Sequence, residues 1–443
     1  MTIFALSSGS GASGIAVIRI SGSETSKIIK KITGQELPSP RMASLRKINN
    51  INTSELIDEG LILWFPGPAS YTGEDLAEIH VHGSRAVINQ IYSTLSEFEN
   101  CRVAEPGEFT KLALQNEKIN LLKAESIGDL ISSETEIQRQ QAIEIMKGSS
   151  QQKFSDLRNQ LIKILSNVEA KIDFPEEDLP KEISKEIKIT AEKIILTIEN
   201  ILDDQKVGER IRAGFKIAIV GPPNVGKSSL INLLASREVA IVSEIAGTTR
   251  DVIETHLNID GYPVIISDTA GIRDSKNEIE QKGIKLALKR AEEANLRVVM
   301  IEPKNLNFTG FLKDLFDENS ILVINKIDKE KININEQIKK LDPILISISK
   351  NSNIDKLIQK IRSHLKNKFN KTEDVFITRE RHRLHLQECL EHLRQFYKKN
   401  DVEDFDKAAE DLRLATRSLG KIIGKVDVEE ILGSIFNDFC IGK

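Results

Sequence analysis

The chain has 443 residues, more than one compact core holds, so two or three domains are expected. Its 62 Lys and Arg residues are balanced by 66 Asp and Glu residues spread along the chain, so the sequence shows no basic block or tail for tight, autonomous nucleic-acid binding. An RNA substrate would need a local patch or a partner. The sequence has no CxxC motif, so we expect no disulfide. It also has no signal-like amino terminus and no run of about eighteen apolar residues, so we expect a cytoplasmic chain without a membrane span.

The first 117 residues mix strand and helix patterns. Strands are predicted at residues 15–20, 61–65 and 77–82, where apolar side chains dominate short segments. A helix is predicted over residues 84–98 between the last of these strands and residue 117. The mixture indicates an α+β domain.

Helices and an α/β unit follow. Apolar side chains return at every third or fourth position over residues 119–172, and again over 183–211 after the break DFPEEDLP. Over residues 216–365, the short strands KIAIV, VIISD, RVVMI and ILVINK alternate with helical segments, which is typical of a doubly wound parallel sheet. Helical patterns resume from residue 379. Helical sequence on both sides predicts that the α/β unit is inserted into a helical domain.

A glycine-rich loop, GPPNVGKS at residues 221–228, lies between a predicted strand and a predicted helix. This order is that of a P-loop, whose backbone N–H groups hold phosphate at a helix amino terminus. Lys227 would reach the β- and γ-phosphate oxygens, and the Ser228 hydroxyl would bind Mg²⁺. The alternative is a chance glycine loop, which two further motifs oppose.

Both further motifs end predicted strands. In DTAG (268–271), Asp268 would hold Mg²⁺ through water, and the N–H of Gly271 would sense the γ-phosphate. In NKID (325–328), Asp328 would accept hydrogen bonds from N1–H and N2–H of guanine, which adenine does not offer. The sequence therefore predicts GTP as the nucleotide. The segment SIS, which begins at Ser347, stands where a loop usually backs the guanine.

Hydrolysis needs groups beyond these motifs. AGTTRD (246–251) lies where a switch loop supplies Thr249 to Mg²⁺, although an ordinary turn has a similar composition. Ile272 stands where Ras-type enzymes carry a water-orienting glutamine, and its side chain forms no hydrogen bond with water. Another positive group would have to neutralise the negative charge on the transferred phosphoryl group. The candidates are Arg250, Arg273 and a monovalent cation beside Asn224. The side chain of Asn224 would equally serve to stabilise its own loop, and the sequence leaves both this role and cation binding open.

The order of these motifs resembles that of TRAFAC GTPases without the catalytic glutamine, and the whole chain resembles the MnmE (TrmE) tRNA-modification GTPases. The segments that carry the resemblance are IRISG, YTGEDLAEIHVHG, EPGEFTKLALQNEKINLLKAES, AKIDFPEED and the terminal FCIGK. The resemblance implies a multidomain fold of α+β and α/β parts. Its domains would be an α+β folate-binding and dimerisation domain (1–117), a discontinuous helical domain (118–212 and 369–443) and an inserted Ras-like P-loop GTPase domain (213–368).

The resemblance also implies a function. Members of the family are homodimers that bind K⁺ and a tetrahydrofolate one-carbon derivative, and they hydrolyse GTP when their G domains meet. With an FAD-dependent partner, MnmG (GidA), in a heterotetramer, they add an aminomethyl or carboxymethylaminomethyl group to C5 of the wobble uridine of certain tRNAs. The alternative is an RNA-assembly GTPase, such as a ribosome-maturation switch, without modification chemistry. That alternative predicts a KH module or a second G domain, neither of which the sequence contains.

Residues matching the family's motifs inherit its roles as expectations. Glu280 would orient the hydrolytic water and act with Lys227, although a solvated charge is the plainer interpretation of Glu280. The folate contacts would be Arg19, Glu78, Lys118 and Lys443. The Mg²⁺ ligands would be Ser228 and Thr249, and the K⁺ ligands would be Asn224, Ser243, Ile245 and Thr248. The predicted nucleotide contacts are Asn224, Val225, Gly226, Lys227, Ser228, Ser229, Ser243, Glu244, Ile245, Ala246, Gly247, Thr248, Thr249, Asp268, Thr269, Ala270, Gly271, Asn325, Lys326, Asp328 and Ser347.

Some residues depart from the family pattern or offer other interpretations. Val81, Ser84 and Asn120 replace usual family residues near the expected folate pocket, so the detail of that pocket is expected to differ from the family pattern. Surface ion pairs are the alternative for the first three folate contacts. Cys440 is better explained as a small buried residue than as a nucleophile. A stripe of potential metal ligands, better explained as a helix surface beside a core, consists of His382, His385, Cys389 and His392.

Overall fold

The computed structural model describes residues 1–9, 11–173, 181–237, 239–240, 254–268, 289–304, 306, 311–329, 334, 336–369, 375–399, 405–426, 435, 439 and 442. The chain forms two compact units. Unit 1 contains residues 1–128, 146–176 and 404–443, and unit 2 contains residues 129–145 and 177–403. Within the described ranges, no helix has the length and apolar character that a membrane span requires. The predicted domain boundaries at residues 117, 212 and 368 remain a prediction.

Unit 1 begins with a six-stranded sheet in the order β3-β4-β5-β2-β1-β6. All neighbours pair antiparallel except β1 and β6, which pair parallel. The strands predicted from sequence are β2, β4 and β5, each longer than predicted, whereas the patterns did not single out the short strands β1, β3 and β6. The bounds are β1 (Thr2–Leu6), β2 (Ser13–Ser21), β3 (Ser44–Asn49), β4 (Leu56–Phe65), β5 (Leu76–Gly83) and β6 (Cys101–Val103).

Helices cover both faces of this sheet. Strand alternation sends Ile18 and Ile20 to one face, where they join a buried core with apolar residues of α1 (Thr25–Thr33) and α2 (Arg85–Ser96). The helix predicted over residues 84–98 is α2. On the opposite face, Ile3 and Ala5 of β1 pack against Phe109 of α3 (Glu108–Gln115).

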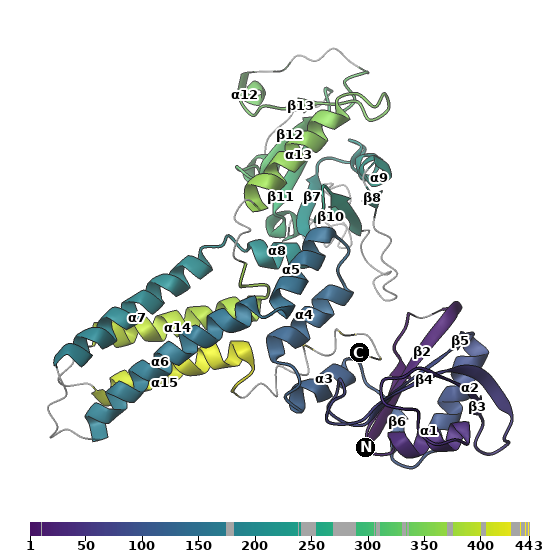
Figure 1. Cartoon of the computed structure of the whole chain (residues 1–443). Coiled ribbons are helices and arrows are strands. Elements are labelled where there is room, and N and C mark those ends of the chain that lie inside the picture. The colour runs from purple at the N-terminus through teal and green to yellow at the C-terminus, as the bar shows by residue number, and fades with distance from the viewer. Residues whose placement is uncertain are drawn as a thin grey trace, which may run out of the picture. The chain divides into compact units, whose positions relative to one another are not determined.

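Unit 1 also contains long helices. The pattern predicted over residues 119–172 resolves into α4 (Leu121–Ile131), α5 (Glu136–Met146) and α6 (Ser149–Asp173). Most of α4 and all of α6 belong to unit 1, whereas residues 136–145 of α5 belong to unit 2. In unit 1, α6 packs along α15 (Phe405–Ile423), and both helices bury one apolar face (Figure 1).

Unit 2 contains a seven-stranded sheet in the order β13-β12-β11-β7-β10-β9-β8. The strands from β13 to β10 pair parallel, and β9 and β8 add an antiparallel edge. This arrangement confirms the doubly wound α/β fold that the sequence predicts. The bounds are β7 (Phe215–Val220), β8 (Val239–Ala240), β9 (Glu254–Ile259), β10 (Tyr262–Asp268), β11 (Leu296–Ile301), β12 (Ser320–Ile324) and β13 (Ile344–Leu345).

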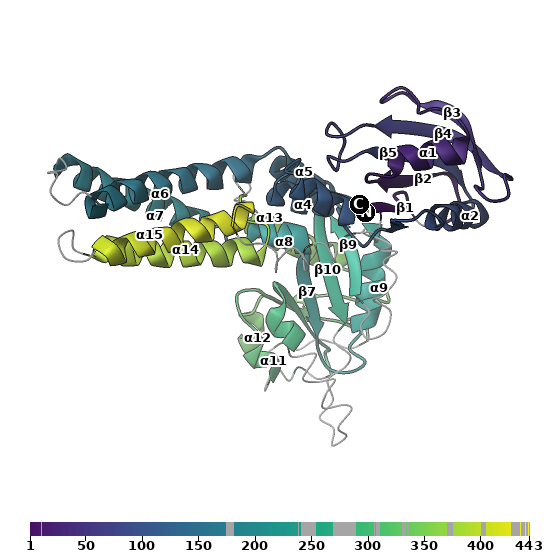
Figure 2. The ribbon, with the colours of Figure 1, turned by 90° about the horizontal axis from the view of Figure 1, so that it is seen from below.

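Both faces of this sheet are buried, which explains why its central strands are apolar almost throughout. Ile217 and Ile219 of β7 point into one core, and Ala218 and Val220 into the other. The helix α9 lies along β10 and β9, as Figure 2 shows. The first core is completed by α8 (Val207–Ala213), α9 (Lys227–Arg237) and α13 (Ile354–Phe369), and the second by α11 (Phe311–Asp314) and α12 (Glu336–Lys339).

A buried arginine joins the remaining helices of unit 2. The helix α7 (Lys181–Leu202) packs along α14 (Glu380–Lys398). From α14, Arg383 donates to Glu209 at 2.7 and 2.9 Å and to Asp204 at 2.6 Å, and its side chain is 7% exposed. A buried charge is tolerated when such partners satisfy it, so this network fixes the start of α14 against α8.

Candidate functional site

The loop between β7 and α9 has the backbone that a phosphate-binding loop needs. At Gly221, a Cβ atom would lie 2.4 Å from the carbonyl oxygen of Met300. At Gly226, which has φ +107°, a Cβ atom would lie 2.5 Å from Nδ2 of Asn325. Asn224 has a φ of 62°, a left-handed conformation that asparagine tolerates. Two glycines and one asparagine therefore allow this loop to approach its neighbours closely.

Lys227 lies at the start of α9, 6% exposed, and its ammonium group folds back over the loop. Its Nζ donates to the carbonyl oxygens of Gly221 and Pro222, both at 3.0 Å. The first turn of a helix directs backbone N–H groups at its amino end, where anions bind. Lys227 and the first turn of α9 thus offer positive charge and donors at the same place, which suits a polyphosphate.

Asn325, at the end of β12, connects this loop to a second one. Its Nδ2 donates to the carbonyl oxygen of Val225 at 2.8 Å, and its Oδ1 accepts from the backbone N–H of Ile348 at 3.2 Å. The residue is 3% exposed, and its hydrogen bond to Val225 is buried, whereas the one from Ile348 is partly buried. The P-loop and the loop after β13 are therefore fixed to one side chain.

Asp328 lies beside that second loop with its carboxylate exposed. It accepts from the hydroxyl of Ser347 at 2.6 Å and from that of Ser349 at 3.0 Å. The hydrogen bond from Ser347 lowers the pKa of Asp328, so the carboxylate is ionised and acts only as an acceptor. An oriented acceptor suits a base edge that presents two adjacent N–H donors.

Lys326 supports the same loops from outside. It has a φ of 65°, and its Nζ donates to the carbonyl oxygen of Asn224 and to Oε2 of Glu302, both at 2.6 Å. Sequence reasoning did not find Glu302 or Ser349, although Glu302 directly follows a buried strand and Ser349 belongs to the segment SIS. The side chain of Asn224 is exposed and makes no hydrogen bond to another described residue.

The other predicted nucleotide residues fall in two groups. Ser228 and Ser229 are exposed in the first turn of α9, and Asp268 ends β10 opposite Ile219 of β7. The remaining predicted residues lie outside the described part of the chain: Ser243, Glu244, Ile245, Ala246, Gly247, Thr248, Thr249, Thr269, Ala270, Gly271 and Glu280. The same is true of Arg250, Ile272 and Arg273.

Two of the predicted folate residues meet on the sheet of unit 1. Arg19 and Glu78 face each other across β2 and β5, and Nη2 of Arg19 donates to Oε1 of Glu78 at 2.8 Å. The guanidinium lies 5.5 Å from the ring centroid of Tyr71 and 5.7 Å from that of Phe109. Burial opposes charge on Glu78, but the hydrogen bond and charge of Arg19 outweigh it and lower the pKa of Glu78.

The predicted folate residue Lys118 approaches the same region. Its Cε lies 2.9 Å from where a Cβ atom of Gly73 would be, and Gly73 follows Tyr71 by two residues in a turn with φ +84°. Nearby, Nδ2 of Asn116 donates to the carbonyl oxygen of Thr72 at 2.7 Å. Lys443 lies outside the described residues. Of the four predicted residues, Arg19 and Lys118 thus lie near the turn 71–73, and Glu78 is paired with Arg19. Sequence reasoning did not find Tyr71 and Phe109, the aromatic partners of Arg19.

The histidine stripe belongs to α14. The interpretation of the stripe as a helix surface is wrong for His382 and Cys389, which are fully buried, and burial raises the pKa of the Cys389 thiol. Nδ1 of His385 lies 2.9 Å from Oε2 of Glu388. Among the described residues, no three His, Cys, Asp or Glu side chains are placed to hold a metal ion.

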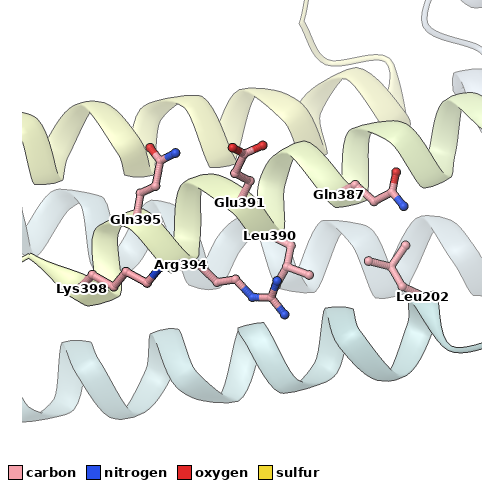
Figure 3. A pocket seen from close by; sticks show the side chains of 7 residues that line it. All are labelled: Leu202, Gln387, Leu390, Glu391, Arg394, Gln395 and Lys398. Carbon is pink, nitrogen blue, oxygen red and sulfur yellow. The ribbon is translucent and has the colours of Figure 1, made fainter.

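A groove runs along the exposed side of α14, away from these groups. It has a volume of about 490 Å³, and Leu390 forms part of its apolar floor (Figure 3). One of its two basic side chains, Arg394, is paired with Glu199 at 2.5 Å. No predicted site residue lies in it. The lining residues are Leu202, Gln387, Leu390, Glu391, Arg394, Gln395 and Lys398.

Comparisons with known proteins cover the whole chain. The family model for the TrmE N-terminus matches residues 2–118, and that for the MnmE helical domain matches residues 121–440. The tRNA modification GTPase MnmE of Pelagibacter ubique (strain HTCC1062) is 67% identical over 443 residues, and that of Rickettsia bellii (strain RML369-C) is 44% identical over 449 residues. Both alignments span 100% of each chain.

A solved structure of Era from Aquifex aeolicus, bound to GDP.AlF4-, aligns with 34% of this chain and 56% of that chain, at 34% identity and a TM-score of 0.28. The assignment to a family does not depend on this partial likeness, because two family models and two full-length relatives agree. The chain belongs to the MnmE family of tRNA modification GTPases.

Proposed function

We propose that this protein hydrolyses GTP and that its hydrolysis drives the modification of tRNA. The observation that carries the proposal is the ionised carboxylate of Asp328, held by two serine hydroxyls beside a loop that Asn325 connects to Lys227 and the start of α9. An acceptor for guanine and donors for phosphate are thus joined in one site. Full-length relatives carry the name tRNA modification GTPase, which supports the second half of the proposal.

In the GTP step, Lys227 would exchange its two loop carbonyls for the β- and γ-phosphate oxygens. Ser228 and Thr249 would hold Mg²⁺, which neutralises the charge that develops on the transferred phosphoryl group. Ser228 fits this role because its exposed hydroxyl lies in the first turn of the helix that follows the phosphate loop. The adjoining residues named in the sequence analysis complete the nucleotide contacts.

Water activation would fall to Glu280, because Ile272 does not hydrogen-bond water. K⁺ would supply the positive charge that an arginine supplies in other GTPases. Asn224 fits K⁺ binding: its exposed side chain makes no hydrogen bond to a described residue, while Lys326 holds its backbone. Ser243, Ile245 and Thr248 would complete the K⁺ site.

A tetrahydrofolate derivative would bind at the Arg19–Glu78 pair, with Lys118 and Lys443, and would supply the one-carbon unit. A pterin ring presents adjacent N–H donors, as guanine does, and the carboxylate of Glu78 is ionised and suited to accept them. Tyr71 and Phe109 hold the guanidinium of Arg19, so the pair is already ordered. Of the residues that depart from the family pattern, Val81 lies in the core on the opposite face of the sheet, and Ser84 caps the amino terminus of α2.

The complete reaction would take place in the cytoplasm. A homodimer of this chain would act with the FAD-dependent MnmG (GidA) in a heterotetramer, and would add an aminomethyl or carboxymethylaminomethyl group to C5 of the wobble uridine. The balanced charge of the chain supports a requirement for a partner in tRNA binding, because it provides no general basic surface.

The first prediction concerns guanine recognition. Asp328→Asn replaces one acceptor oxygen by an N–H donor, so GTP affinity falls at least about 100-fold. Xanthosine triphosphate binds this variant better than GTP does, because its carbonyl at C2 accepts from the new donor. Equilibrium titration with both nucleotides measures this change. Asp342→Asn is the matched control, because Asp342 is exposed in the same unit and has a φ of 50°, which asparagine tolerates. Unchanged GTP affinity in Asp328→Asn would remove the guanine assignment.

The second prediction concerns the cation. The proposed K⁺ site predicts that GTP hydrolysis is faster in K⁺ than in Na⁺ at equal ionic strength. Asn224→Gly keeps the left-handed backbone, removes the side chain and abolishes the K⁺ stimulation, while GDP affinity stays within about threefold. Initial rates of phosphate release in the two salts test this. Equal wild-type rates contradict the role of K⁺.

The third prediction separates tRNA modification from ribosome assembly. In a strain that lacks the gene, mass spectrometry of tRNA nucleosides finds wobble uridines without the C5 group, and the wild-type gene restores them. Gene copies encoding Asp328→Asn restore little, and those encoding Asp342→Asn restore fully. Fully modified wobble uridines in the deletion strain, together with immature ribosomal subunits, would favour the assembly GTPase instead.

A further inference from the structure

The helix α13 departs from the charge balance of the whole chain. Over Ile354–Phe369, five residues are Lys or Arg and only Asp355 is acidic, whereas the whole chain has 62 Lys and Arg residues against 66 Asp and Glu residues. The apolar side chains of α13, among them Leu357, Ile361 and Leu365, are buried in the first core of the sheet in unit 2. Burial of this face turns the opposite face of the helix to solvent.

Six exposed residues make up the outward side of α13, and none of them is acidic. They recur at steps of three and four residues, which places them on one side of the helix. Three are lysines, and three are uncharged residues whose side chains form hydrogen bonds. Side chains of these kinds contact the phosphates and sugars of nucleic acids. This lysine face consists of Lys356, Gln359, Lys360, Ser363, Lys366 and Asn367.

Acidic side chains on or beside α13 are paired individually with basic ones. The pairs are Arg237–Asp355 at 2.5 Å, Lys360–Asp342 at 3.1 Å and Arg362–Asp260 at 3.4 Å. Lys360 is the member of the lysine face among them, and the side chain of its partner Asp342 is 86% exposed. An exposed ion pair of this kind contributes little net free energy, so a phosphate group can replace Asp342 beside Lys360.

The other two lysines of the face leave positive charge in excess. Lys356 and Lys366 form no ion pair with another described residue, and ten residues of helix place them about 15 Å apart along the axis. Burial, and then the charges of Lys360 and Lys368, lower the pKa of His364, which shows that the positive field reaches its ring. A field of one sign over this length attracts a polyanion.

We propose that the lysine face of α13 contacts the phosphate backbone of tRNA. This inference rests on the proposed function, in which tRNA is the substrate. An anionic membrane surface would also attract lysines, but a helix that lies on a membrane inserts large apolar side chains, and the lysine face has none. Lysine contacts to phosphate do not depend on base sequence, so this face positions the tRNA and does not select it.

The test is a titration of the full-length protein with an unmodified tRNA transcript, followed by fluorescence anisotropy over a range of salt concentrations. Lys356→Gln/Lys366→Gln binds the transcript at least about tenfold more weakly than the wild type at about 100 mM salt. The slope of log affinity against log salt concentration falls by about two, one for each lost phosphate contact. The variant unfolds at the wild-type temperature, because both changes are exposed.

A matched control and a variant of opposite sign separate this contact from general charge and from damage. Lys289→Gln/Lys313→Gln removes two exposed lysines whose segments pack into the second core, on the other face of the sheet, through Ala291 and Leu312. This control keeps the wild-type affinity and salt slope. Asp342→Asn removes the acidic partner of a lysine on the face and strengthens tRNA binding about twofold, which a damaged fold does not do.

Wild-type affinity and salt slope in a folded Lys356→Gln/Lys366→Gln variant would overturn the inference. Wild-type protein that binds no tRNA even at low salt would overturn it as well, because a local face must bind RNA without a partner. Fully modified wobble uridines in the strain that lacks the gene would instead remove the tRNA part of the proposed function. In that case, the same titration still decides whether this face binds RNA.

Discussion

The side chain of Asn325 is the contact on which the nucleotide site depends. Its amide donates to the phosphate loop at Val225 and accepts from the guanine-side loop at Ile348, and its backbone N–H donates to Ile301 of β11. Lacking a Cβ, Gly226 leaves room for this amide. Because one buried residue fixes both loops, the distance between the phosphate donors and the carboxylate of Asp328 is set before any nucleotide binds.

The two candidate sites, each within its own unit, use the same physical device. In both, a carboxylate is kept ionised by local partners: serine hydroxyls at Asp328, and the guanidinium of Arg19 at Glu78. An ionised carboxylate only accepts hydrogen bonds, so each carboxylate is suited to a ring with adjacent N–H donors. Guanine and a pterin, the rings proposed for the two sites, both present such an edge.

The P-loop and NKID were predictable because their chemistry lies in contiguous residues between a strand and a helix. The central strands of unit 2 were predictable too, since burial on both faces makes them apolar throughout. The Arg19–Glu78 pair came only from family resemblance, because it depends on a strand register that a sequence does not display. The patterns did not single out β1, β3 and β6, of which β6 has only three residues. The contact of Gly128 with Phe439 joins positions about three hundred residues apart, which no local pattern displays.

The most direct test of this account is the affinity of Asn325→Ala for GTP and GDP, measured by fluorescence titration. The change removes the side-chain partner of a buried carbonyl at Val225 and of a partly buried N–H at Ile348, and affinity for both nucleotides falls about 100-fold. Asn295→Ala is the matched control, because Asn295 also bonds a backbone group, the N–H of Lys216 at 2.9 Å, but at the opposite edge of the same sheet. Its affinities stay at the wild-type level. A folded Asn325→Ala that binds both nucleotides as the wild type does would contradict the claim that this side chain holds the site together.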